Sequence, residues 1–349
     1  MTAPQTPGHG LSDLTGISNR PEATATLADS AELAVVIRGD FVESRHAGSA
    51  VVLGQDAAVL RTVGDPAAPV FGRSSLKPLQ ALAALSAGAE LEGVELAVAS
   101  ASHSGTPAHV EAVRSILARA QLPESALQCP AVMSADAEAR AGVRAAGGGP
   151  APIYMECSGK HAAMLLACVA NGWDISGYLD AEHPVQKHIV DTLERLTGEK
   201  IAGVAVDGCG APTFAVSLTG LARGIQRIAT AQASSPFPLY KKAAAVTQAI
   251  RDFPWAIHGQ GRSDSVLVER LGVLAKRGAE GLLVVAAPDG TTVALKVLDG
   301  AHRPATVVAL TLLVKAGALP AASVAAVLPD VVSPVLGGGR PVGEVRPVV

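Results

Sequence analysis

The sequence predicts an α+β fold, in which helices pack around an antiparallel sheet whose first and last strands are adjacent. β-rich runs occur near the start of the chain, helical stretches fill its middle, and further β-rich runs occur near its end. Of the 349 residues, 49% are apolar and 17% are charged, so the chain can bury a large core. One large domain or two closely associated lobes fit that length.

Residues 1–33 are rich in Pro, Gly, Ser and Thr and show no sustained periodicity, so we expect a flexible arm before a domain of residues 34–349. The runs "LAVVIRGDFVESRHAGSAVVL" and "AAVLRTVGD" contain Gly-Asp turns and predict an antiparallel meander at a sheet edge. A helical insertion is expected at roughly 75–275, with helices at 76–88, 107–120, 159–171, 184–196, 238–253 and 264–277.

The C-terminal part returns to strands. In "GLLVVAAPDGTTVALKVLDG" two Val-rich runs flank Pro288-Asp289-Gly290 and predict a hairpin, and "PATVVALTLLVKAGAL" has the periodicity of a helix. The Gly-rich stretches "AAGGGPAP" and "LGGGRPVG" are expected to be short loops. Early and late strands in one sheet would make the first and last strands neighbours.

Composition excludes several classes of partner. The net charge of −3 forms no basic stripe, so we expect no nucleic-acid partner. The first 20 residues lack a basic and an apolar signal region, and no uncharged apolar run reaches roughly 18 residues, so we expect no membrane partner and a cytoplasmic location. The four cysteines are expected to be thiols or metal ligands, with Cys129 and Cys168 as buried thiols.

The stretch "FGRSSLKPLQALAAL" places Ser74 and Lys77 three residues apart, where a helix is expected to begin near Ser75. With Pro78 in the first turn, Ser74 would be the N-cap and Lys77 would lie on the same face. A serine becomes a nucleophile when a neighbour accepts its proton, and a lysine of lowered pKa can do so. Taken alone, the stretch is better explained as an ordinary helix start, because Ser-x-x-Lys is common by chance.

Two further stretches extend this pattern. "ASASHSGTPAH" places Ser102 in a turn that would either aim a hydroxyl into a cleft or cap the helix near Pro107. Lys276 in "LAKRGAEGLL" falls between a helix and a strand. Penicillin-recognising enzymes combine S-x-x-K, S-D-N and K-T-G in this order and at similar spacing, although Lys276 is followed here by Arg-Gly.

A second group contains cysteines. "MECSGKHAAM" carries Cys157, Lys160 and His161, and "VAVDGCGAP" carries Asp207 and Cys209. Two thiolates and a nitrogen would suit a tetrahedral zinc with water in the fourth position, and a lysine binds zinc only as the neutral amine. Buried thiols are the alternative. Asp207 is either a turn-former or a carboxylate that holds a substrate ammonium.

Together, "RSSLKPLQAL", "ASHSG", "ECSGKHAAML", "DGCGAP" and "KRGAEGLL" resemble the rhizobial-type L-asparaginases, the asparaginase II family also called class 3. The resemblance runs from about Val35 to the C-terminus. It implies a fold similar to serine β-lactamases and transpeptidases, a homodimer, and hydrolysis of L-asparagine to L-aspartate and ammonia.

Motif by motif, the resemblance implies site residues in four groups. Ser74 would be the nucleophile and Lys77 its base, and Ser102 and Lys276 would form a second Ser–Lys pair. The zinc ligands would be Cys157, Lys160 and Cys209. The substrate-binding residues would be Arg73, His161 and Asp207.

The sequence also departs from the family pattern. Glu156 stands where Asn is usual and Thr106 where Glu is common, so selectivity or affinity is in question. Spacing assigns no role to Glu43, to His46 or to residues 258–265. The alternative functions are a serine β-lactamase or D,D-peptidase, and a non-catalytic zinc-binding relative.

Overall fold

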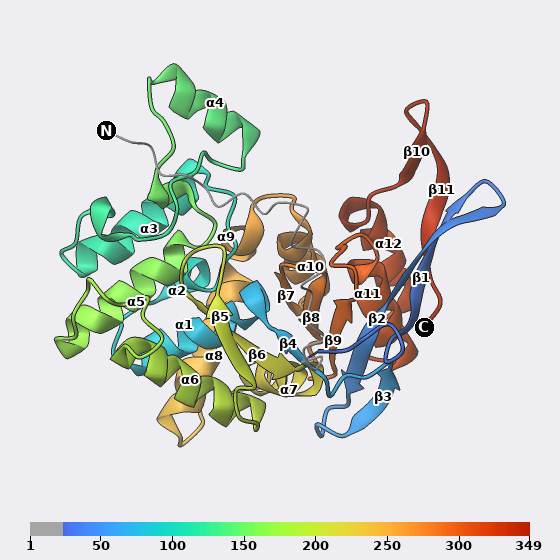
Figure 1. The fold of residues 1–349 in the computed structure, drawn as a ribbon, viewed down its shortest axis with the longest axis horizontal. Helices are drawn as coiled ribbons and strands as arrows, with labels where there is room; N and C mark the ends of the chain where they lie inside the picture. The colour runs from blue at the N-terminus through green and yellow to red at the C-terminus, as the bar shows by residue number, and fades with distance from the viewer. Residues whose placement is uncertain (1–23) are drawn as a thin grey trace, which may run out of the picture.

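The structure is a computed structural model that describes residues 24–349. Figure 1 shows a helical region on one side and a curved antiparallel sheet on the other. The strands of this sheet follow the spatial order β10-β11-β1-β2-β9-β8-β7, and β3 also pairs with β2. Their bounds are Ala31–Arg38 (β1), Phe41–Leu53 (β2), Val59–Val63 (β3), Leu274–Gly278 (β7), Leu282–Ala286 (β8), Thr292–Val297 (β9), Val335–Gly337 (β10) and Arg340–Pro347 (β11).

The first and last strands of the chain are neighbours in the sheet. β1 pairs antiparallel with β11, where Val36 lies opposite Val345, and the predicted hairpin is formed by β8 and β9. These pairings confirm the predicted fold class. The predicted edge position of the N-terminal meander is wrong, because β2 pairs with β1, β3 and β9 and lies inside the sheet.

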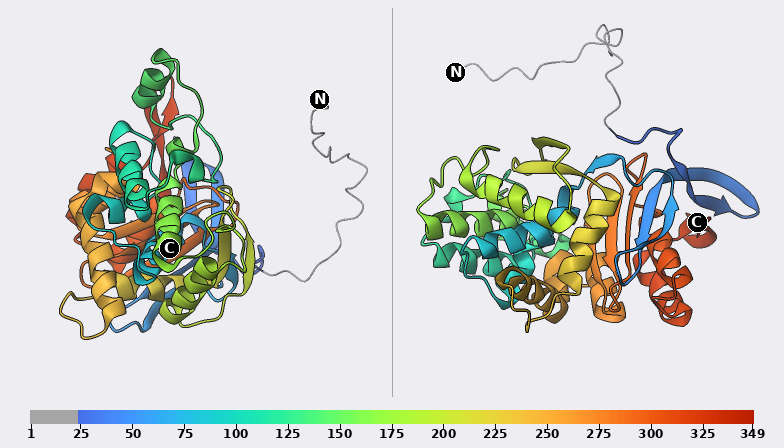
Figure 2. Two further views of the ribbon diagram at one scale, coloured as in Figure 1. Left: turned by 90° about the vertical axis from the view of Figure 1, so that its left-hand side faces the viewer. Right: turned by 90° about the horizontal axis from the view of Figure 1, so that it is seen from below.

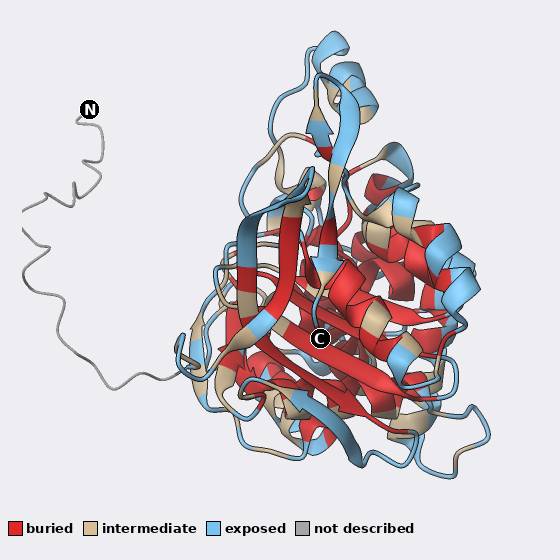
Figure 3. Cartoon of the chain, turned by 90° about the vertical axis from the view of Figure 1, so that its right-hand side faces the viewer, coloured by how far each residue is buried: buried red, intermediate tan, exposed pale blue. Residues whose placement is uncertain are grey.

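Helices cover both faces of the sheet. α11 (Ala305–Lys315) packs on β8 and β9, and α7 (Leu218–Ala229) packs on β2, β8 and β9. Figure 2 shows these helices on opposite sides of the sheet, with α12 (Ala321–Val331) beside α11. Because both faces are covered, β8 is a continuous buried apolar run, without the alternation of a strand that faces water (Figure 3).

The helical region is built around α1 (Lys77–Ser86), which is almost entirely buried and packs against α5, α6 and α8. A small second sheet of order β4-β6-β5 lies between this region and the large sheet. The remaining bounds are α2 Gly93–Ala99, α3 Pro107–Arg119, α4 Ala137–Ala145, α5 Ser158–Asn171, α6 Pro184–Thr197, α8 Pro238–Asp252, α9 Pro254–His258, α10 Ser263–Leu271, β4 Pro69–Phe71, β5 Gly203–Val206 and β6 Pro212–Ser217.

Two predicted segments differ from the structure. The helix expected at 264–277 ends with α10 at Leu271, because Gly272 takes the left-handed conformation, and residues 274–278 form strand β7. "LGGGRPVG" is not a loop throughout, since only its central glycines Gly338 and Gly339 turn the chain between β10 and β11.

The first strand begins slightly earlier than the sequence predicts. β1 begins at Ala31, inside the predicted arm, and residues 1–23 of that arm lie outside the described residues. Between residues 24 and 349, none of the helices has both the length and the apolar character needed to cross a bilayer.

Candidate active site

Ser74 lies in a 3₁₀ turn, η2 (Arg73–Leu76), between β4 and α1. The predicted N-cap role is wrong, because Leu76 precedes α1 and the Ser74 side chain caps neither helix, although Pro78 does occupy the first turn. The Ser75 hydroxyl donates to Gly72 O at 2.5 Å and ties the turn together. Ser75 is therefore the structural serine of the pair.

Arg73, next to Ser74, has a φ of +47°. This is the left-handed region, which residues with a Cβ rarely adopt, and such strained positions cluster at functional sites. Arg73 pairs with Asp207 across the site, with Nε 2.8 Å from Oδ1. Burial raises the pKa of Asp207, but Lys160, the Gly208 N–H and Arg73 together outweigh it, so the pKa lies below its ordinary value.

Strand β7 approaches this turn closely. A Cβ built on Gly278 would lie 2.9 Å from Gly72 O and 3.1 Å from Ser75 N, so only glycine allows the two backbones to meet. The same strand carries Lys276, which is 0% exposed. Close packing of β7 on η2 therefore brings Lys276, which is distant in sequence, next to the Ser74 turn.

A buried network links the two lysines through Ser102. Lys77 Nζ lies 2.9 Å from Ser102 Oγ and 2.7 Å from Ala101 O, and Lys276 Nζ lies 3.0 Å from the same Ser102 Oγ. Within the described residues no hydrogen bond joins Ser74 Oγ to Lys77 Nζ, because the Lys77 amine points to Ser102 and the Ala101 carbonyl instead. The contact expected from helical spacing is therefore absent in this structure.

The network is suited to proton transfer. Burial lowers the pKa of Lys276 to about 8; Asp264 opposes this shift and Lys77 adds to it. Two ammonium groups on one hydroxyl repel each other in a buried site, which favours a neutral amine on one of them. A neutral lysine amine can accept a proton from a serine hydroxyl.

The zinc residues predicted from sequence also come together. Lys160 Nζ lies 3.4 Å from Cys209 Sγ, and a tetrahedral zinc with bonds of about 2.3 Å to sulfur and about 2.0 Å to nitrogen holds such a pair about 3.5 Å apart. Interaction with the Cys157 thiol lowers the pKa of Cys209 to about 5, and the same interaction together with burial raises the pKa of Cys157. These three side chains fit a zinc ion.

The lysine is needed for that fit. In the part of the chain that the structure describes, no group of three or more His, Cys, Asp and Glu side chains is arranged to hold a metal. His161 does not replace Lys160, because its Nδ1 lies 2.7 Å from Tyr178 Oη. Burial lowers the pKa of His161 to about 3, so the ring is neutral.

The outer nitrogen of His161 is a candidate substrate donor. Tyr178 Oη accepts from Gln128 N at 3.0 Å, so its own proton can go to His161 Nδ1 and the ring proton then sits on Nε2. Nε2 is buried and has no hydrogen-bond partner among residues 24–349. A buried donor of this kind is costly unless a ligand accepts from it.

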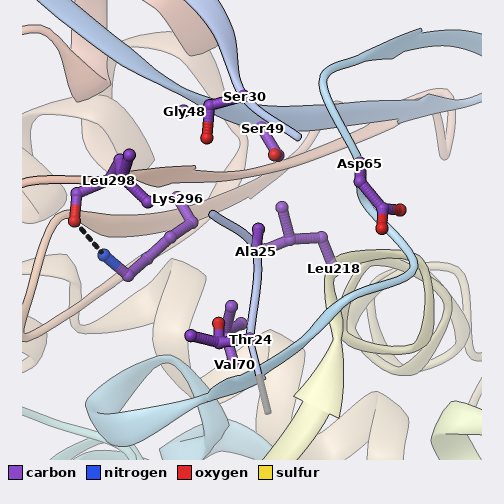
Figure 4. A pocket seen from close by; sticks show the side chains of 10 residues that line it. All are labelled: Thr24, Ala25, Ser30, Gly48, Ser49, Asp65, Val70, Leu218, Lys296 and Leu298. Carbon is purple, nitrogen blue, oxygen red and sulfur yellow. Dashed lines mark hydrogen bonds between the residues drawn. The ribbon is translucent and has the colours of Figure 1, made fainter. Parts of the chain in front are cut away.

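A cavity of about 410 Å³ opens beside Arg73. Its apolar floor comes from the small sheet and includes Phe71 and Ala215, and Glu280 and Lys296 line its charged part. Figure 4 shows a smaller recess of about 70 Å³, where Lys296 Nζ points to Leu298 O. None of the predicted site residues lines that recess, whereas Arg73 joins the larger cavity to the site.

The other residues noted in the sequence separate into two groups. Glu43 pairs with Arg38 and His46 lies 3.2 Å from Asp299, both on β2, which β9 and β8 separate from β7. Residues 258–265, in contrast, lie against β7, where Asp264 contacts Lys276. Spacing in the sequence assigns this loop no role.

The two departures from the family pattern have different surroundings. Thr106 is the N-cap of α3 and accepts from His109 N, so it has a helix-capping role. The Glu156 carbonyl accepts from Lys77 Nζ at 3.4 Å, while its side chain is exposed.

The model of the family described as L-asparaginase II matches residues 34–347. A search of curated proteins found no match.

Among solved structures, a native form of Mglu has a TM-score of 0.45 at 12% identity and covers 77% of this chain, which spans 64% of that protein, less than two thirds. A Bacillus glutaminase in 4.3 M NaCl has a TM-score of 0.43 at 11% identity, with 78% of this chain and 91% of that one covered. A probable glutaminase from Bacillus subtilis complexed with 6-diazo-5-oxo-L-norleucine has a TM-score of 0.40 at 10% identity, with 78% and 84% covered. Similarities of this strength identify no substrate. Because the family model spans nearly the whole chain, the protein belongs to the L-asparaginase II family.

Proposed function

We propose that the protein hydrolyses L-asparagine to L-aspartate and ammonia through an acyl-enzyme on Ser74. The observation that carries the proposal is the buried Lys77–Ser102–Lys276 network beside the Ser74 turn. Nucleophilic serines need a neighbouring base, and a pair of lysines with one neutral amine supplies it. A homodimeric enzyme is part of the proposal and rests on the resemblance to the family, and a cytoplasmic location is proposed with it.

In this mechanism the substrate zwitterion binds between Arg73 and Asp207. These side chains pair with each other at 2.8 Å, and the substrate would exchange that pair for two new ones, its α-carboxylate with Arg73 and its α-ammonium with Asp207. The His161 Nε2–H would donate to the bound substrate. This arrangement would position the side-chain amide toward Ser74.

Ser74 Oγ then attacks the amide carbon while its proton passes to a neutral amine of the lysine network. The C–N bond breaks as the network returns a proton to the leaving nitrogen, which departs as ammonia. A water molecule, deprotonated by the same network, cleaves the ester and releases aspartate. Two proton transfers to and from the same groups explain why both lysines are buried together.

Zinc is proposed as the cofactor, held by Cys157, Lys160 and Cys209. Bound zinc would tie the start of α5 to the β5–β6 turn that carries Asp207. No chemical step is assigned to the metal. Its role in the proposal is to hold the substrate-binding turn in place.

Ammonia release from L-asparagine tests the proposal, with Ser74→Ala beside Ser75→Ala as the matched control. We expect Ser74→Ala to abolish activity and Ser75→Ala only to reduce it, because Ser75 holds the turn while Ser74 attacks. Asparagine turnover that survives in Ser74→Ala would exclude Ser74 as nucleophile. Hydrolysis of nitrocefin without asparaginase activity would favour a β-lactamase-like function, and inactivity on both would favour the non-catalytic alternative.

A further inference from the structure

We propose that Asp264 is a positioning residue that holds Lys276 in the proton-transfer network and sets its charge. Asp264 lies in the first turn of α10, where an acidic residue is common at any helix start. Its surroundings here go beyond that general preference. The inference rests on the proposed function, because it concerns the lysine that exchanges protons with the Ser74 reaction.

The Asp264 carboxylate is buried and uses both oxygens on β7. Its side chain is 1% exposed, its Oδ1 accepts from Arg277 Nε at 2.9 Å, and its Oδ2 accepts from Arg277 N at 3.0 Å. The same Oδ2 lies 3.8 Å from Lys276 Nζ. By binding the peptide N–H that follows Lys276, the carboxylate holds the strand from which the lysine side chain extends.

The Asp264 carboxylate approaches Lys276 from α10, whereas Lys77 lies on α1 and Lys276 itself on β7. The charged and titratable groups around Lys276 come from every element packed against it: Asp264 on α10, Lys77 on α1, Arg277 on β7, Glu156 before α5, His258 on α9 and His302 after β9. Of the acids in this set, Asp264 is the buried one, and the Glu156 side chain is exposed. Asp264 is therefore the main counter-charge for the lysine pair.

Two neighbours of Lys276 have opposite effects on its protonation. Asp264 favours the ammonium form, whereas Arg277 disfavours it. Asp264→Asn keeps the shape and an acceptor oxygen but removes the negative charge. Arg277→Gln removes the positive charge and leaves Asp264 with Lys276 as its nearest cation. The two variants should move the titration of Lys276 in opposite directions.

The experiment follows Lys276 directly, by the ¹³Cε signal of labelled lysine in the full-length protein, assigned by its absence in Lys276→Arg. We expect the titration midpoint to fall by about 1–3 units in Asp264→Asn and to rise in Arg277→Gln, as for opposite and like charges within about 4–6 Å. The pH profile of kcat/KM for asparagine should move with it. Arg270→Gln, which removes an exposed pair of α10 with Asp330, is the matched control and should move neither.

The outcomes separate this inference from the proposed function. Unchanged midpoints, or shifts of the same sign in both variants, would overturn the positioning role. If Asp264→Asn does not fold, Arg277→Gln decides alone, and an unshifted Lys276 signal in it would overturn the role. A wild-type protein inactive on asparagine, with opposite shifts still present, would support the role of Asp264 and refute only the proposed substrate.

Discussion

Substitution of Gly278 by alanine should lower activity by moving the turn that carries Ser74. The new Cβ would lie 2.9 Å from Gly72 O and 3.1 Å from Ser75 N, both backbone atoms that cannot rotate away. An ordinary contact between the new Cβ and Gly72 O is 3.4 Å long, so the turn must move away by 0.5 Å from the 2.9 Å that the present backbone would give. Because a misplacement of about 1 Å can cost about 100-fold in rate, we expect a loss of about tenfold in kcat/KM.

The same substitution should also destabilise the fold modestly. Overpacking of a tight contact costs about 1–3 kcal/mol of unfolding free energy. Ammonia release from asparagine and urea unfolding measure the two effects separately. Gly142→Ala is the control, because Gly142 lies in α4 with nothing within 4 Å of the position that a Cβ would take, and it should gain about 0.5–1 kcal/mol at unchanged kcat/KM. A Gly278→Ala protein with wild-type kcat/KM would refute the close-approach argument.

Three further predictions concern the network, the metal and the core. The rate of asparagine hydrolysis should rise with pH through about 8, because the neutral form of Lys276 increases there. A rate that stays flat from roughly one pH unit below that value to roughly one unit above it would contradict this prediction. Elemental analysis should find zinc in the wild-type protein and in Cys168→Ser but not in Cys157→Ser or Cys209→Ser; zinc-free wild-type protein would exclude the site. Leu79→Ala should lower the free energy of unfolding by about 2–5 kcal/mol in urea titrations, since Leu79 is 0% exposed, and a loss below about 1 kcal/mol would show that the core refills the cavity.

Local patterns predicted much of the fold. The Gly-Asp turns and Val-rich runs identified the strands around β1, β2, β8 and β9, and helical periodicity identified α1, α3, α5, α6, α8 and α11. One error occurred where a single residue changes the backbone, at Gly272, which ends α10 and allows Lys276 to lie on a strand. Hydrophobic periodicity alone does not detect such a stop, because the apolar pattern continues across it.

The sequence by itself determined the chemical groups, because nucleophile, amines, thiols and carboxylates are properties of residue types. Short motifs in a fixed order also determined the family. Only the tertiary structure decided which groups meet. It turned the Lys77 amine toward Ser102 instead of Ser74 and brought the Lys276 amine to the same Ser102 hydroxyl. It also paired Asp264 with Lys276. These contacts join residues up to 174 positions apart, and their distances depend on how β7, α1 and α10 pack, which no local spacing specifies.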